Sequence, residues 1–174
     1  MYYSNLKPHD VANGAGVRVS LFVSGCEHAC PGCFNPEAWQ FCFGQPFTTQ
    51  TQQQIINALK PDYIQGFTLL GGEPLHPQNR GTILALIERI RRELPEKNIW
   101  CYTGYHFDHE LLPEAHTSSE LMALLQHIDI LVDGRFMQAH KSFSTRFRGS
   151  SNQRVLCCKA SLQAGHAVLA TEFD

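Results

Sequence analysis

The chain of 174 residues carries a formal net charge of −2, with 43% hydrophobic and 17% charged residues. This length fits one domain with a real core, residues 1–174, and the weak charge gives no reason to expect nucleic acid as a partner. We find no apolar run of about 18 residues and no basic and apolar N-terminal signal, so we expect a cytoplasmic protein without membrane contact.

Strands and helices alternate along the first half of the chain. Residues 17–23 are apolar and β-branched and predict a strand, and Thr51 with Gln54 forms a capping box before a short helix that ends near Pro61. A buried strand is expected over residues 67–70. Apolar residues at helical spacing then predict a helix over residues 79–94.

The alternation continues in the second half. Residues 99–103 predict a strand, and Thr117 with Glu120 caps a helix that carries Leu121, Leu124 and Leu125. Residues 128–132 and 154–158 predict two more strands. The tail, residues 159–174, has a turn at Ala164-Gly165 and is expected to form a terminal hairpin.

This order predicts an α/β fold with mainly parallel strands covered by helices and an active site at the carboxyl ends of the strands. A complete eight-unit barrel needs about 200 residues or more. We therefore expect a partial (β/α) barrel of about five or six strands, open on one side.

Three of the seven cysteines, Cys26, Cys30 and Cys33, follow the first predicted strand within one loop. Thiolates at this spacing suit one cubane iron–sulfur cluster, and three ligands leave one iron open for the amine and carboxylate of a substrate. A structural zinc site is the alternative. It needs a fourth ligand, for which His28 or Cys42 is available.

The segment CEHACPGCFNPEAW resembles the cluster loop of radical S-adenosylmethionine (SAM) enzymes, in which an aromatic residue, here Phe34, follows the third cysteine. The blocks NGAGVRVSLFVSGCEHACPGCFN, GGEPLHPQN, YTGY, LVDGRF and RGSSNQR are similar, in the same order, to the activating proteins of anaerobic (class III) ribonucleotide reductases. This resemblance covers roughly residues 1–156. The remaining tail matches no block that we recognise.

The resemblance implies an oxidoreductase that holds a [4Fe-4S] cluster on Cys26, Cys30 and Cys33 and binds SAM at the open iron. Reductive cleavage of SAM would yield a 5′-deoxyadenosyl radical, which abstracts hydrogen from one glycine of the anaerobic ribonucleoside-triphosphate reductase and leaves a glycyl radical there. A small electron-donor protein, such as a flavodoxin or ferredoxin, is the second implied partner.

SAM is expected to contact the cluster loop and the strand ends. Gly71 and Gly72 let backbone approach a ligand, with the space at Gly72 left for methionine, and Pro74 keeps Glu73 extended. As a lone tetrapeptide this motif is equally a plain turn. The predicted SAM-binding residues are Gly32, Cys33, Phe34, Gly71, Gly72, Glu73, Pro74, Thr103, Asp133 and Asn152; no catalytic residue beyond the cluster and SAM is predicted.

Two other patterns have structural interpretations. Asn13-Gly14-x-Gly16 precedes a strand, so we interpret it as a tight turn rather than a dinucleotide site. Cys157 and Cys158 are neighbours in a predicted strand and face opposite sides, which favours core packing over shared metal binding.

Two other functions stay open at this stage. The first is a radical SAM enzyme that acts on another glycyl-radical enzyme, a peptide or a small molecule. The second is a zinc-stabilised binding module.

Replacing any one of Cys26, Cys30 or Cys33 by Ala is expected to abolish SAM cleavage, because the cluster loses one of three protein ligands. The same change at Cys42, Cys101, Cys157 or Cys158 should not. Iron content and 5′-deoxyadenosine formation after anaerobic reconstitution check this. A Cys26→Ala protein that binds a full cluster while Cys42→Ala does not would refute the assignment.

Overall fold

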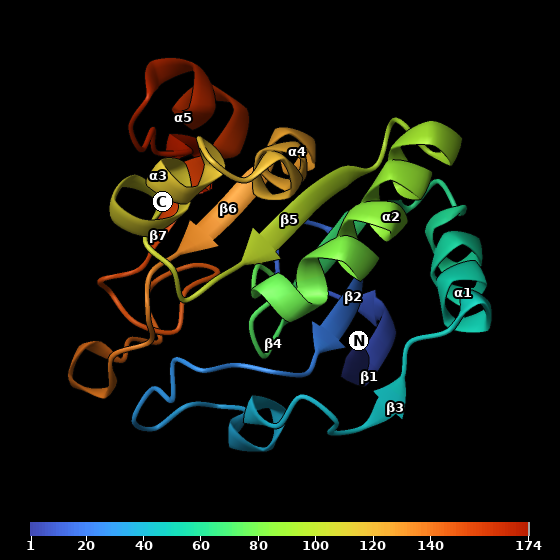
Figure 1. Cartoon of the computed structure of the whole chain (residues 1–174), viewed down its shortest axis with the longest axis horizontal. Helices are drawn as coiled ribbons and strands as arrows, with labels where there is room; N and C mark the ends of the chain where they lie inside the picture. Colours follow the sequence, from blue (N-terminus) through green and yellow to red (C-terminus); the bar gives the residue numbers. More distant parts are fainter. Residues whose placement is uncertain (174) are drawn as a thin grey trace.

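The computed structural model describes residues 1–173, and within them one seven-stranded sheet has the order β3-β1-β2-β4-β5-β6-β7 (Figure 1). The strands are β1 Tyr2–Asp10, β2 Val17–Val23, β3 Gln45–Pro46, β4 Ile64–Gly71, β5 Asn98–Tyr102, β6 Ile130–Asp133 and β7 Arg154–Cys157. The α-helices are α1 Thr49–Leu59, α2 Pro77–Glu93, α3 Leu112–Ala115, α4 Ser119–His127 and α5 Cys158–Ala164.

The sheet is parallel in its centre and antiparallel at both edges. β2, β4, β5 and β6 run parallel to one another, whereas β1 pairs antiparallel with β2 and β7 pairs antiparallel with β6. The predicted α/β class is confirmed, but seven strands replace the five or six expected, and the sheet does not close. β1 was missed because its sequence, YYSNLKPHD, is largely polar. An antiparallel strand can expose one face to solvent, so it does not need an apolar sequence.

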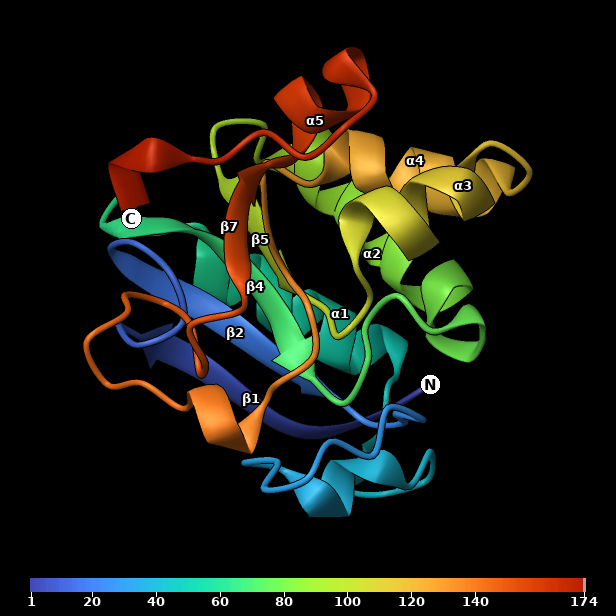
Figure 2. The same cartoon turned by 90° about the vertical axis from the view of Figure 1, so that its left-hand side faces the viewer.

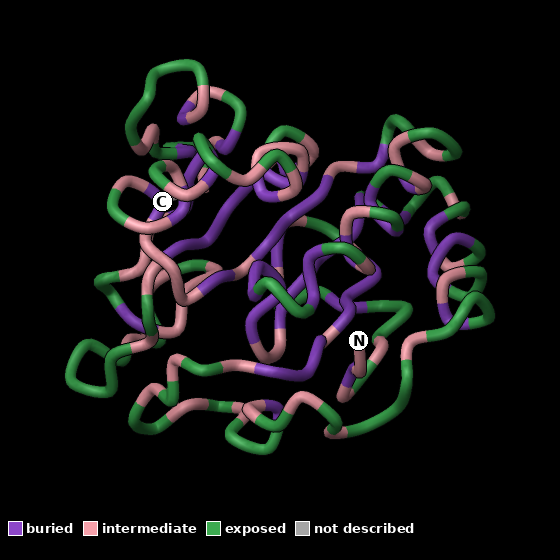
Figure 3. Tube along the Cα trace, in the orientation of Figure 1, coloured by how far each residue is buried: buried purple, intermediate pink, exposed green. Residues whose placement is uncertain are grey.

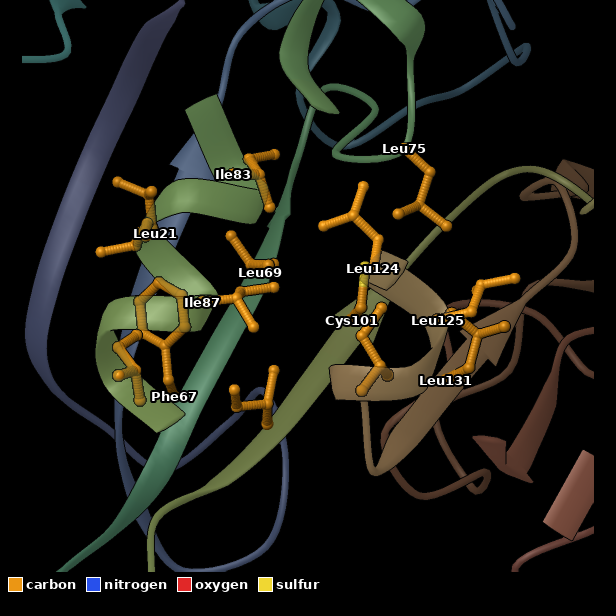
Figure 4. Packing of buried hydrophobic residues seen from close by; sticks show 14 of the residues in the cluster. Leu21, Phe67, Leu69, Leu75, Ile83, Ile87, Cys101, Leu124, Leu125 and Leu131 are labelled. Atoms are coloured by element: carbon orange, nitrogen blue, oxygen red, sulfur yellow. The ribbon is translucent and has the colours of Figure 1, made fainter. Parts of the chain in front are cut away.

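The main core lies between the sheet and the helices α1, α2 and α4. Alternate strand residues such as Leu21, Phe67, Leu69 and Leu131 point to this side and are fully buried. Figure 4 shows them packed against Ile83 and Ile87 of α2 and Leu124 and Leu125 of α4. The buried centre of the sheet and its exposed loops are distinguished in Figure 3.

The opposite face of the sheet is covered by loops. Trp100, Val132 and Val155 form a second apolar cluster there, against which Phe147 packs with its ring centroid 5.1 Å from that of Trp100. Figure 2 shows the segment after β6, in orange, crossing this side of the sheet while the α-helices lie on the other. This face is therefore covered by loops and a small apolar cluster rather than by helices.

Arg18 is a buried cation on the loop-covered face. Its guanidinium donates to Thr68 Oγ1 at 2.6 Å and to Asn98 Oδ1 at 2.7 Å, and it lies 5.3 Å from the Trp100 ring. Burial lowers the pKa of Arg18 to about 10. The side chain thereby ties β2 to β4 and β5.

Three helices begin at other residues than the sequence predicts, because other residues cap their N-terminal ends. Thr48, not Thr51, is the N-cap of α1, and the two form the capping box together. Ser118 rather than Thr117 caps α4 by accepting from the amide of Leu121. The helix expected from residue 79 begins at Pro77, a residue suited to the first helical turn.

The predicted terminal hairpin is wrong for the described part of the tail, and residue 174 lies outside the described residues. Cys158 opens helix α5, which ends at Gly165 in the left-handed conformation with φ of 72°. Cys157 ends β7, so the two cysteines do not share a strand as predicted. Cys158 is nevertheless fully buried, as expected for a core residue. No helix in residues 1–173 has the length and apolar character needed to cross a membrane.

Candidate active site

The loops that follow β2, β4, β5 and β6 meet at one edge of the sheet, because these strands are parallel and end together. They surround a cavity of about 700 Å³. Its wall includes Cys26, Cys30, Cys33, Gly72, Thr103 and Gly134. The cavity therefore lies at the carboxyl ends of the strands, where the sequence predicts the site.

The cysteine loop begins at a backbone clamp. Gly25 has φ of 97°, which favours glycine, and its amide donates to the carbonyl of Ala38 at 2.8 Å. The amide of Cys26 donates to the carbonyl of Trp39 at 3.1 Å. The chain thus leaves the sheet and returns to the same point, so the residues between form a closed loop.

All three thiols of this loop are half-buried. Burial raises the pKa of the Cys26 thiol to about 11 and also raises the pKa of Cys30. A metal must displace these protons, because the thiolate is the ligand. In the described part of the chain no group of three or more Cys, His, Asp or Glu side chains is already arranged to hold a metal ion.

The donor set fits a three-thiolate site better than a four-ligand zinc site. His28 Nε2 lies 2.9 Å from Glu73 Oε2, and its Nδ1 accepts from Arg135 Nε at 3.3 Å, so both ring nitrogens are engaged. Cys42 is exposed and not part of the cavity wall. Neither residue proposed as a fourth zinc ligand is positioned to serve.

Glu73 is the residue to which the loops around the cavity are joined. Its side chain is 1% exposed. Oε1 accepts from the Leu75 amide at 2.9 Å and from Thr103 Oγ1 at 2.8 Å. Oε2 accepts from the Gly104 amide at 2.8 Å and contacts His28 at 2.9 Å. The carboxylate therefore connects the ends of β4 and β5 to the cysteine loop.

His28 fits closely into this arrangement. Because Arg135 can only donate to Nδ1, the ring proton belongs on Nε2, facing Glu73. The ring makes an edge contact with Tyr105, with centroids 4.6 Å apart. A side chain at Gly104 would collide with the His28 ring, so glycine is needed there.

The two glycines of the GGEP motif line the cavity, but Gly72 has a role that sequence reasoning did not foresee. A Cβ at Gly72 would lie 2.6 Å from the carbonyl oxygen of Gly25 and 2.9 Å from that of Ala38. It would point into the clamp of the cysteine loop. The sequence analysis expected the missing side chain to leave space for methionine, but the Cβ position faces the cysteine loop instead.

The other predicted SAM-binding residues fall into two groups. Cys33, Phe34 and Thr103 line the cavity. The rest are not part of its wall: Gly32 faces Gln138, Glu73 and Pro74 are buried, Asp133 is buried against Arg154, and Asn152 donates to the carbonyl of Arg135 at 2.9 Å. Their contact with SAM stays a prediction.

Sequence reasoning missed the part of the wall that is formed by Phe22, Phe136 and residues 141–143, 145 and 147–149. Phe22 was treated only as part of an apolar strand. The signal for the segment was compositional: residues 134–170 contain no Asp or Glu, and basic and aromatic residues alternate in KSFSTRFR. Asn13 of the predicted turn also reaches the cavity.

Comparison with known proteins shows the class of protein to which the chain belongs. A family model described as a 4Fe-4S single cluster domain matches residues 12–156. The chain is 46% identical over 157 residues to the anaerobic ribonucleoside-triphosphate reductase-activating protein of Haemophilus influenzae and 48% identical to that of Escherichia coli K12, covering 89% of this chain and 97% of each relative. The protein of that name from phage T4 is 40% identical, with 89% and 93% covered. The chain belongs to the anaerobic ribonucleoside-triphosphate reductase-activating protein family, which confirms the resemblance found in the sequence.

Replacing Gly72 by Val is expected to reduce iron loading as well as SAM binding, because the side chain displaces the clamp at a cost of about 1–3 kcal/mol. Iron and sulfide analysis after reconstitution, with urea unfolding, measures both effects. Gly81→Ala on α2 is the control, since a Cβ there meets only Glu120 Oε1 at 3.2 Å. Normal iron content with weakened SAM binding would instead place this side chain in the SAM site.

Replacing Glu73 by Gln is expected to lower the free energy of unfolding by about 1–3 kcal/mol, because an amide nitrogen cannot accept from the Gly104 amide and His28. Iron loading should fall with it. Urea unfolding and iron analysis test this against Glu88→Gln, an exposed position on α2. Unchanged stability with a loss of SAM affinity alone would show that the carboxylate serves SAM.

Proposed function

We propose that this chain activates the anaerobic ribonucleoside-triphosphate reductase by generating a glycyl radical on it. Cys26, Cys30 and Cys33 would hold a [4Fe-4S] cluster with one iron open to SAM. The observation that carries this proposal is that all three thiols line one cavity together with the ends of β4 and β5. Family membership names the partner.

A cluster held by Cys26, Cys30 and Cys33 would supply the electron for reductive cleavage of SAM to methionine and a 5′-deoxyadenosyl radical, and that radical would take a hydrogen atom from the glycine to give 5′-deoxyadenosine. The protein's own residues bind and orient the reactants. Backbone carbonyls near Gly71 and Gly72 are suited to the ammonium group of SAM, and Thr103 Oγ1, on the wall, stays fixed by Glu73. Phe34 offers an aromatic surface beside the third cysteine.

The proposal also includes the type of barrel, the segment that covers its open flank and the electron donor. An open sheet whose four parallel strands end at one cavity supports a partial barrel of the radical SAM type. An open flank also leaves a radical accessible to solvent, so a segment of the reductase has to cover it. A flavodoxin or ferredoxin is the proposed electron donor.

The decisive experiment combines reconstituted protein, reductant, SAM and the reductase, and quantifies 5′-deoxyadenosine and glycyl radical spins in the same samples. Alone, the protein should cleave SAM slowly. With the reductase, the first equivalent of cleavage should appear as glycyl radical.

A large 5′-deoxyadenosine yield that is equally uncoupled from radical formation with and without the reductase would contradict the proposal. It would favour another glycyl-radical enzyme, a peptide or a small molecule as substrate. A colourless protein that takes up zinc and no iron would favour the binding module.

A further inference from the structure

We propose that Arg135 raises the reduction potential of the cluster that the cysteine loop would hold, because its charge offsets that of the buried Glu73 across the ring of His28. Arg135 is thereby assigned as a positioning residue for the electron-transfer step. The inference rests on the proposed function, from which it takes the cluster. It adds a residue that controls how readily this cluster accepts an electron.

Four side chains form a continuous series of contacts from the interior of the protein to its surface. Glu73, which is 1% exposed, has its Oε2 2.9 Å from His28 Nε2. Arg135 Nε donates to the other ring nitrogen of His28 at 3.3 Å, and Arg135 Nη2 donates to Glu110 Oε1 at 3.1 Å. The side chains of Arg135 and Glu110 are 56% and 37% exposed. The series therefore consists of a buried negative charge, a neutral ring and a partly exposed ion pair.

Both the carboxylate and the guanidinium lie close to the thiols. His28 stands between Cys26 and Cys30 in the sequence. Its two ring contacts therefore bring Glu73 and Arg135 to the cysteine loop. Burial is the main cause that raises the pKa of Cys26, and the charge of Glu73 raises it further. Burial also raises the pKa of Cys30, whereas the charge of Arg135 acts to lower it.

Reduction makes the group held by the thiolates more negative by one charge. The electron comes from a one-electron reductant, a flavodoxin or ferredoxin in the proposed function, and no bond or proton is exchanged in this step. A negative charge nearby disfavours the reduced form and lowers the potential, and a positive charge nearby raises it. Removing the charge of Arg135 would leave Glu73 unopposed on this side of the loop, and the potential would fall.

Arg135 is held at a fixed position by its backbone. Gly134, just before it, has φ of 97°, and its amide donates to the carbonyl of Tyr105 at 3.0 Å. The carbonyl of Arg135 accepts from Asn152 Nδ2 at 2.9 Å. Figure 2 shows the segment after β6, in orange, beside the light blue cysteine loop. A charge fixed in this way needs no reorganisation when the electron arrives.

The test compares Arg135→Gln with Arg135→Lys in the full-length reconstituted protein. Gln removes the charge, whereas Lys keeps it but loses the planar fork that contacts both His28 and Glu110. Arg92→Gln is the matched control, because Arg92 is exposed in the last turn of α2 and is not part of the cavity wall.

The ratio of reduced to oxidised cluster is measured by electron paramagnetic resonance at a series of applied potentials, without SAM and without the reductase. Iron content, SAM binding and urea unfolding are measured for every variant.

We expect this ratio, at a given potential, to fall about fivefold in Arg135→Gln, which corresponds to about 40 mV for a one-electron couple. Arg135→Lys should stay within about twofold of the parent protein, because the charge remains. Arg92→Gln should not differ from the parent protein. Raising the salt from about 0.05 to 0.5 M should reduce the effect of Arg135→Gln, because the side chain is partly exposed.

An unchanged potential in Arg135→Gln with normal iron content would overturn the inference, and weaker SAM binding in that variant would then assign the guanidinium to SAM. Equal falls in the Gln and Lys variants would also overturn it, because lost hydrogen bonds and not lost charge would be the cause.

If Arg135→Gln takes up no iron, Glu110→Gln decides the matter. This change leaves the charge of Arg135 without its partner, so the ratio of reduced to oxidised cluster should rise about threefold. An unchanged or lower ratio would overturn the inference.

These outcomes do not depend on the glycyl radical. An unchanged potential leaves the proposed function intact. A parent protein that holds a reducible cluster and cleaves SAM, but forms no glycyl radical with the reductase, contradicts the proposed function alone. A parent protein that takes up no iron overturns both.

Discussion

The site depends on one buried carboxylate. Glu73 has four donors around it, and these come from the turn after β4, from the end of β5 and from the cysteine loop. A buried carboxylate without hydrogen-bond partners costs free energy. Moving any of these segments away from Glu73 is therefore unfavourable, and the contacts hold the segments together. The cysteines thereby acquire a fixed relation to the strands although they lie in a loop without regular structure.

The sheet explains why a cavity exists beside this carboxylate. One face of the strands is filled by α1, α2 and α4, whereas the other carries Arg18 and a small aromatic cluster and is covered only by loops. The antiparallel β1 and β7 at either side widen the sheet without closing it. An unclosed sheet leaves the reacting end open to a macromolecular partner, consistent with a family whose members are named as activators of another protein.

The same open side carries a division of charge. The cysteine loop carries the exposed Glu27 and Glu37, whereas the segment of residues 134–149, which contains no acidic residue, supplies part of the cavity wall. The two segments beside the cavity therefore differ in charge. Charge differences on a protein surface affect the choice of partner and the rate of association more than they add affinity.

The sequence by itself determined the local features of this protein. Patterns of neighbouring residues predicted the strand over residues 17–23, the glycine turn at Gly71 and the cluster spacing of Cys26, Cys30 and Cys33. The order of the elements predicted the position of the site, because parallel strands end at the same edge of a sheet. The tertiary structure alone decided what required partners distant in the chain. Glu73 turns to His28, and Gly72 faces the carbonyl of Gly25. Such contacts arise from packing across long sequence separations, which no local periodicity encodes, so the roles of these residues followed only from the fold.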